Sequence, residues 1–83
     1  MRFTVTWNPI AEGQLLDLWA DFPEDREGLT GAIREIDRVL RDDPLSKGRP
    51  FGVSRILIWP PVVVLHSVDE ADRKVKILLV KRL

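Results

Sequence analysis

The stretch VSRILIWPPVVVLHSVDEADRKVKILLVKR, residues 53–82, decides the fold of this chain. It contains three runs dominated by β-branched and other apolar residues, a composition that is enriched in strands. The runs are Val53–Trp59, Val62–Val68 and Lys74–Val80. They are separated by Pro60–Pro61 and by the polar segment Asp69–Arg73, and both breaks are typical of turns. We therefore predict three consecutive antiparallel strands.

Alternation along these strands divides their side chains between two faces, because successive residues point to opposite sides of a sheet. Both faces are apolar at their centres, whereas a small antiparallel sheet usually leaves one side polar. The face expected to lie under helices carries Ser54, Ile56, Ile58, Val62, Val64, His66, Val68, Val75, Ile77 and Leu79. The face expected to be uncovered carries Leu57, Trp59, Val63, Leu65, Leu78 and Val80. Because an exposed apolar patch usually marks a partner surface, we expect the second set to bind a protein.

The residues before this stretch predict one more strand and two helices. Arg2–Trp7 alternates between apolar and polar residues and is expected to join the sheet with its aromatic side chains toward the core. Asn8 and Pro9 are a good N-cap and first helical residue, and apolar residues recur at helical spacing as far as Phe22. A second helix is expected from about Pro23–Asp25 to Arg41. Its apolar stripe is Leu29, Ala32, Ile33, Ile36, Val39 and Leu40.

The segment Leu45–Gly52 is rich in Gly, Pro and basic residues and is expected to be a loop. The predicted order is therefore β-α-α-β-β-β in a single domain, residues 1–83. Two helices of this length can cover only one face of a sheet. We predict a two-layer α+β fold in which an αα-hairpin packs on one face of a four-stranded, mainly antiparallel sheet.

Composition excludes several classes of site. The chain has no cysteine, so it has neither disulfides nor thiolate metal ligands, and a reducing cytoplasmic location is expected. No signal peptide or membrane-spanning apolar run is present, and we expect no cofactor, no metal and no membrane partner. The net charge is zero, but residues 1–46 hold five basic and ten acidic side chains, whereas residues 47–83 hold eight and three. The sheet half is thus basic and could attract an anionic partner.

The familiar catalytic motifs are missing, including a glycine-rich phosphate loop, and the chain has one histidine and no tyrosine. Alternation places His66 on the face expected under the helices, where a core histidine with a satisfied hydrogen bond is expected more than a catalytic one. The basic residues allow two interpretations. Arg49, Arg55 and Arg82 could bind phosphate and stabilise charge during phosphodiester cleavage. Alternatively, they are strand-end charges that protect the sheet against aggregation.

Four segments together resemble the RelE/ParE superfamily of toxins from bacterial type II toxin–antitoxin modules. They are WNPIAEGQLLDLW at 7–19, AIREIDRVLRDDPLSKGRP at 32–50, SRILIWPPVVVLHSVDE at 54–70 and VKILLVKR at 75–82. The resemblance implies a toxin involved in growth inhibition and plasmid stabilisation, which a small antitoxin neutralises by wrapping around it. It also implies that the target is either mRNA on the ribosome or DNA gyrase.

In the endonuclease branch of that superfamily, basic residues on the last three strands surround the mRNA. By this resemblance Arg55 matches the second-strand position approximately and Arg82 matches the last one, whereas the third-strand arginine position falls on Val63. The candidate catalytic residues are these two matches, Arg55 and Arg82, together with Arg49 from the basic loop before the sheet. The alternative is a degenerate, non-catalytic binding module that pairs with a second copy to cover its own sheet face.

Overall fold

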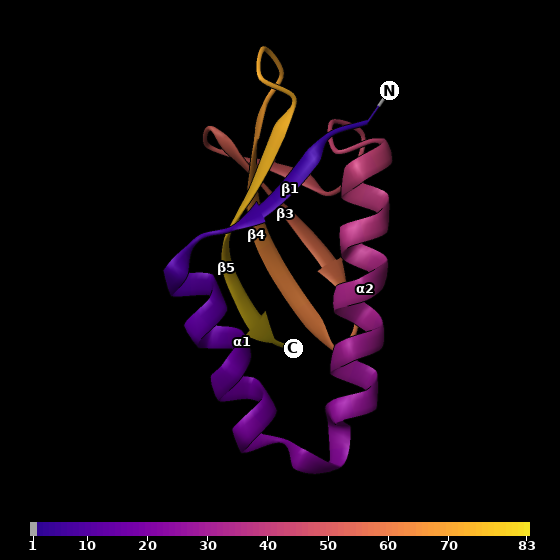
Figure 1. The fold of residues 1–83 in the computed structure, drawn as a ribbon, viewed down its shortest axis with the longest axis vertical. Coiled ribbons are helices and arrows are strands. Elements are labelled where there is room, and N and C mark those ends of the chain that lie inside the picture. The colour runs from indigo at the N-terminus through magenta and orange to yellow at the C-terminus, as the bar shows by residue number, and fades with distance from the viewer. Residues whose placement is uncertain (1) are drawn as a thin grey trace.

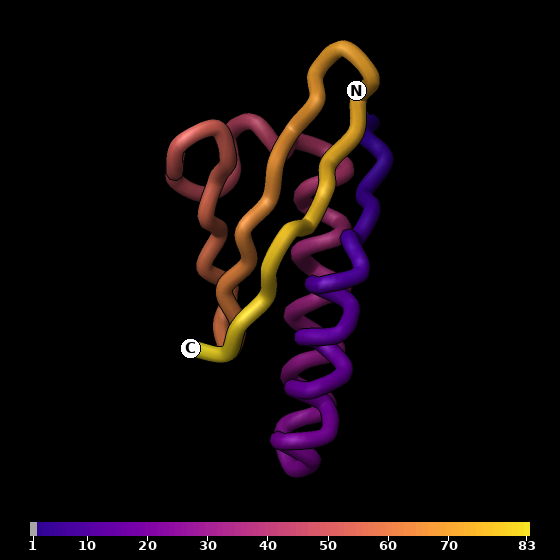
Figure 2. The backbone as a smooth tube through the Cα atoms, turned by 90° about the vertical axis from the view of Figure 1, so that its left-hand side faces the viewer, coloured from indigo at the N-terminus to yellow at the C-terminus, as the bar shows by residue number. Residues whose placement is uncertain are grey.

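The computed structural model describes residues 2–83, which form two layers: a five-stranded mixed sheet, and two α-helices against one of its faces (Figure 1). The elements in order are β1 (Thr4–Trp7), α1 (Pro9–Asp21), the short 3-10 helix η1 (Pro23–Asp25), α2 (Arg26–Asp42), β2 (Arg49–Phe51), β3 (Ser54–Trp59), β4 (Val62–Asp69) and β5 (Lys74–Arg82). The strands lie in the order β1-β5-β4-β3-β2. Figure 2 shows the two layers from the side.

The predicted meander is confirmed, because β3 pairs with β4 and β4 with β5, both antiparallel. The first strand also joins the sheet as predicted, and it runs parallel to β5. The prediction of four strands was wrong by one. Arg49–Phe51, expected within a loop, pairs antiparallel with β3. Gly48 and Gly52 flank this short strand with φ of 76° and 62°, values that glycine adopts readily and that let the chain reverse on either side of it.

Both helices begin and end close to their predicted positions. The side chain of Asn8 accepts a hydrogen bond from the Ala11 N–H at 2.8 Å and caps α1. The residues in the predicted stripe of α2 are buried except for Ile33, which is half-buried. The helices meet at η1 and separate with distance from it (Figure 1).

The core lies between the helices and the covered face of the sheet, but the predicted face of β3 was wrong. Leu57 is 6% exposed and belongs to the core, whereas Ile58 is 59% exposed on the other side. The two-residue turn Pro60–Pro61 explains the difference, because it places Trp59 directly opposite Val62. Residues that pair directly share a face, so Trp59 lies on the helix side together with Val62.

The predicted faces of β5 hold for its first half and reverse in its second half. His66 pairs with Ile77 and Leu65 pairs with Leu79, so Leu78 has no partner on β4. One extra residue in a strand is a β-bulge, and it exchanges the two faces for every residue that follows. Val80, expected on the uncovered face, is therefore buried in the core. Leu79, expected under the helices, lies on the uncovered side.

Candidate functional site: the open sheet face

The side of the sheet away from the helices is covered by no other element of residues 2–83, and its centre is apolar. We call this surface the open face. Its apolar residues are Phe51, Ile56, Ile58, Val63, Leu65 and Leu79. Every strand from β2 to β5 contributes to it, because the register brings alternate residues of these strands to the same side.

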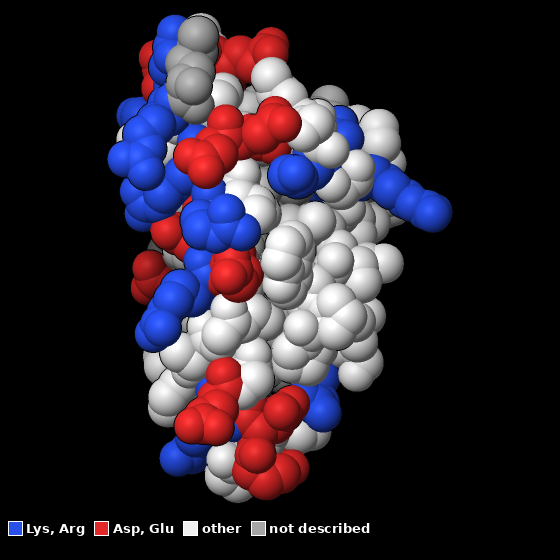
Figure 3. Space-filling model, turned by 90° about the vertical axis from the view of Figure 1, so that its right-hand side faces the viewer, with Lys and Arg blue, Asp and Glu red and all other residues white. Residues whose placement is uncertain are grey.

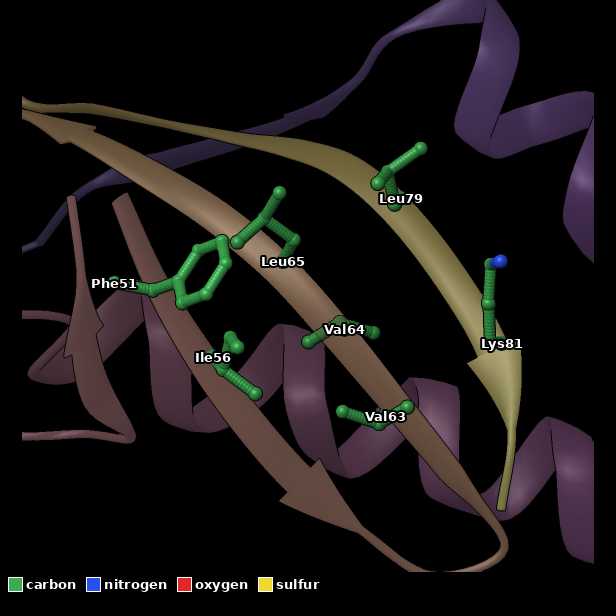
Figure 4. A pocket seen from close by; sticks show the side chains of 7 residues that line it. All are labelled: Phe51, Ile56, Val63, Val64, Leu65, Leu79 and Lys81. Carbon is green, nitrogen blue, oxygen red and sulfur yellow. The ribbon is translucent and has the colours of Figure 1, made fainter. Parts of the chain in front are cut away.

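A shallow depression of about 180 Å³ occupies the middle of the open face (Figure 4). The Phe51 ring points toward Leu65 at one end, and the Lys81 side chain stands at the other end. The lining also includes Ile56, Val63, Val64 and Leu79. The depression is too open to enclose a small molecule, and it has the shape and composition of a surface that receives apolar side chains from another protein.

Basic residues surround this apolar centre. Arg49 pairs with Ile56, Lys76 with Ser67 and Lys81 with Val63, so all three basic residues share the open face. Figure 3 shows acidic and basic side chains together over the helical layer, and a largely uncharged surface with basic side chains at its margin over the sheet layer. The open face therefore favours a partner segment with apolar side chains and acidic flanks.

The residues predicted to bind an antitoxin do not lie together. Val63 and Leu65 are on the open face as predicted, but Leu57 and Val80 are buried in the core. The remaining two are half-buried, Trp59 against the core and Leu78 at the bulge. Phe51, Ile56, Ile58 and Leu79 were missed. The two-residue turn at Pro60–Pro61 was a sequence signal that could have shown that Trp59 pairs with Val62. That pairing assigns each residue of β3 to its correct face.

The three candidate catalytic arginines also lie apart. Arg49 is on the open face at the sheet edge. Arg55 lies on the helix side, where its Nε donates to the Lys47 carbonyl at 2.7 Å and its Nη2 to the Gly48 carbonyl at 3.0 Å. These bonds attach the loop before β2 to β3, so Arg55 has a structural role in this arrangement.

Arg82 lies on the helix side at the far end of β5. Its guanidinium pairs with the Asp25 carboxylate and stacks over the Phe22 ring, 4.4 Å from the ring centroid. It therefore links the C-terminal strand to the turn between the two helices. The three guanidinium groups consequently have different surroundings, and they do not converge on one phosphate-sized position.

His66 is in the core, as predicted, and it is fully buried. Within the part of the chain that the structure describes, neither ring nitrogen has a hydrogen-bond partner, so the predicted satisfied bond was wrong. Burial lowers the pKa of His66, and the charge of Arg55, its neighbour on β3, lowers the pKa further. The Pro44 backbone acts in the opposite direction but does not reach either nitrogen with hydrogen-bond geometry. A neutral buried imidazole of this kind cannot contact a substrate on the open face.

Two other kinds of site are absent from residues 2–83. Among these residues there is no group of three or more His, Cys, Asp or Glu side chains placed to hold a metal ion. Over the same span, no helix has the length and apolar character needed to cross a membrane.

Solved structures with the same fold come from toxin–antitoxin complexes. A chain of the toxin–antitoxin complex RelBE2 from Mycobacterium tuberculosis matches with a TM-score of 0.83 and 22% identity, covering 100% of both chains. A chain of the chromosomal ParDE TA system from P. aeruginosa matches with a TM-score of 0.79 and 20% identity, over 99% of this chain and 97% of that one. No protein-family model matches the sequence, and a search of the curated proteins finds no match either.

This protein thus has a fold found in toxin–antitoxin complexes. The RelBE2 and ParDE chains share this fold over nearly their whole lengths, and it is the fold that the resemblance of the four sequence segments implied.

Proposed function

We propose that this chain is the toxin component of a two-protein toxin–antitoxin module, and that its antitoxin binds the open face. One observation carries the proposal: a chain with this fold leaves an apolar surface uncovered on the side of the sheet away from its helices. Exposed patches of this kind mark protein interfaces, and the match to RelBE2 and ParDE chains supplies the class of partner.

The chemistry of the open face describes the antitoxin segment that fits it. Apolar side chains would enter the depression beside Phe51, Val63 and Leu79, and acidic side chains would lie near Lys76 and Lys81. The apolar centre would contribute most of the affinity, because fully desolvated contacts dominate interface energetics. The lysines at the margin would mainly raise the association rate.

Growth of bacteria that express this chain alone is the first test. We expect growth to stop, and to recover when the proposed antitoxin is expressed with it. Unchanged growth, with soluble and folded protein confirmed, would contradict the assignment as a toxin.

A matched pair of variants tests the binding surface. Val63→Asp should weaken antitoxin binding by about 2 kcal/mol or more, since it places an unpaired charge at the centre of the interface. Val53→Asp adds the same charge at the turn between β2 and β3, where the residue is fully exposed, and should leave binding unchanged. Calorimetric titration of the purified antitoxin into each folded variant measures both affinities.

The positions of the arginines bear on the target. Because Arg55 holds the loop before β2 and Arg82 pairs with Asp25, cleavage of mRNA by these residues together with Arg49 is the less favoured activity. Translation on ribosome-bound mRNA and gyrase supercoiling should be assayed with the same preparation. Cleavage of mRNA that is lost in Arg82→Ala would restore the nuclease assignment. A folded chain that affects neither process would favour the non-catalytic binding module.

A further inference from the structure

Strand β2 is weakly attached to the rest of the open face. It has three residues, all of them exposed, and it lies at the edge of the sheet, where its one strand partner within residues 2–83 is β3. Gly48 and Gly52 flank it with positive φ, and glycine tolerates a change of backbone direction at such positions. Segments with few buried contacts open at a low free energy, so we expect β2 to move more readily than the other strands of the open face.

The side chain of Arg55 fixes the loop before β2. From the helix side of β3 it donates one hydrogen bond to the Lys47 carbonyl at 2.7 Å and one to the Gly48 carbonyl at 3.0 Å. The loop packs closely against β3 here, because a Cβ on Gly48 would collide with the Ile56 carbonyl. The closed position of the loop therefore depends on where one guanidinium group lies.

His66 borders both this guanidinium group and the loop. It pairs directly with Arg55 across β3 and β4, and directly paired residues share a face of the sheet. The imidazole is fully buried, and neither of its nitrogens has a hydrogen-bond partner among residues 2–83. Pro44, which is fully buried at the start of the loop, brings its backbone close to the ring. A change in the charge of His66 would therefore act on both.

A positive charge on His66 would have no acidic partner among the described residues. Arg55 is the one charged side chain of residues 2–83 that acts on it, and burial beside this cation lowers the pKa of His66. Asp43, the acidic residue next to Pro44, is exposed and accepts a hydrogen bond from the Ser46 hydroxyl. The side chains that the other elements bury in the core are uncharged: Val5, Ala11, Leu29, Ala32, Ile36, Val39, Leu40, Val75, Ile77 and Val80.

We propose that protonation of His66 releases the loop before β2, so that β2 separates from the sheet at acidic pH. A proton on the imidazole places a second positive charge beside the Arg55 guanidinium inside the core, and the two groups repel each other. Opening of the loop breaks the two hydrogen bonds of Arg55 and lets water solvate both cations. The open state therefore binds the proton more tightly than the closed state, and protonation favours opening by the same factor.

Such a movement would change the open face. Phe51 borders one end of its depression, and Arg49 is one of its basic residues (Figure 4). Both belong to β2, so the open face loses them when β2 separates. An effect on antitoxin affinity rests on the proposed function, whereas the movement of the loop requires no partner and is tested without one.

Amide hydrogen exchange of the isolated chain, followed by NMR, measures the movement. The protection factors of the Arg49 and Phe51 amides, which correct for the intrinsic pH dependence of exchange, should fall about tenfold between about pH 7.5 and pH 5.5. This is the limit for one group that titrates at its ordinary pKa of 6.5 in the open state. The Ala11 amide is the internal reference, because the Asn8 side chain that caps it does not titrate. Its protection should stay constant.

Two kinds of variant identify the groups responsible. His66→Gln keeps a buried polar side chain but takes up no proton, so protection of β2 should be the same at both pH values. His66→Leu should give the same result. Arg55→Ala should lower the protection of β2 already at the higher pH, because the loop loses its two side-chain hydrogen bonds. Circular dichroism checks that each variant is folded.

Three results would overturn the proposal. They are constant protection of β2 in the wild type, a tenfold fall that persists in both His66 variants, and protection that Arg55→Ala leaves unchanged. None of these results bears on whether the chain is a toxin, since the growth and antitoxin-binding tests are made separately.

Discussion

Replacing His66 by leucine should stabilise the protein and remove part of its pH dependence. The imidazole is fully buried on β4, and its two nitrogens are without partners among the described residues. An unsatisfied buried polar group costs about 1–3 kcal/mol, and leucine is an apolar residue of comparable size that has no polar atoms. We therefore expect His66→Leu to raise the free energy of unfolding by roughly 1–3 kcal/mol near pH 8.

The pH dependence follows from the lowered pKa of His66. The unfolded chain takes up a proton near pH 6.5, whereas the folded chain does so only at a lower pH. The contribution of neutral His66 to the free energy of unfolding is therefore fully present above pH 6.5. It is lost as the pH decreases from 6.5 to the lowered pKa of the folded state. The slope attributable to this one group cannot exceed about 1.4 kcal/mol per pH unit.

Urea unfolding followed by tryptophan fluorescence, at several values between about pH 8 and pH 5, measures both effects. Carboxylates contribute their own slope, so the decisive quantity is the difference between wild type and variant. His66→Gln is the matched control, since it removes the titration but keeps a buried polar group. His66→Gln should lose the same pH dependence, but its free energy of unfolding at pH 8 should not exceed that of the wild type. A His66→Leu variant that is less stable than wild type at pH 8, or that keeps the full slope, would refute the reasoning.

Three further predictions concern local structure. Gly48→Ala should lower the free energy of unfolding by about 2–4 kcal/mol, because φ is positive and the new Cβ would collide with the Ile56 carbonyl. Gly52→Ala also has a positive φ but its Cβ meets open space, so it should cost only about 1 kcal/mol. Urea unfolding measures both. Asn8→Ala removes the N-cap of α1 and should lower stability by about 1 kcal/mol in the same assay, with Asn8→Asp close to wild type. Arg55→Ala should cost about 2 kcal/mol and speed amide hydrogen exchange in residues 45–52, because it removes two hydrogen bonds to loop carbonyls; unchanged exchange there would contradict the structural role of Arg55.

The elements that the sequence predicted well are those with strong local signals. Asn8 and Pro9 mark the start of α1, and the stripe from Leu29 to Leu40 identifies the buried side of α2. The short strand β2 was missed because three residues carry too little periodicity to be recognised. Its formation depends on pairing with β3 and on the two glycines that reverse the chain on either side.

The candidate site was only partly predicted, for a related reason. Alternation gives two sets of residues in each strand, but it does not say which set of one strand joins which set of the next. Val63 and Leu65 were placed correctly, whereas Leu57 was placed on the wrong side. The reason is that the two-residue turn Pro60–Pro61 pairs Trp59 with Val62, and alternation along each strand does not include this pairing. The arginines were grouped by their charge, and only the folded chain shows that Arg82 pairs with Asp25.

By itself, the sequence determined the order of the main elements, the two-layer class of the fold and the presence of two apolar sheet faces. These properties depend on residue type and on periodicity along the chain. The tertiary structure decided which residues the open face contains, because one extra residue at Leu78 reverses the second half of β5. It also decided that Arg55 and Arg82 serve the fold, since their partners at Gly48 and Asp25 become neighbours only when distant segments pack together.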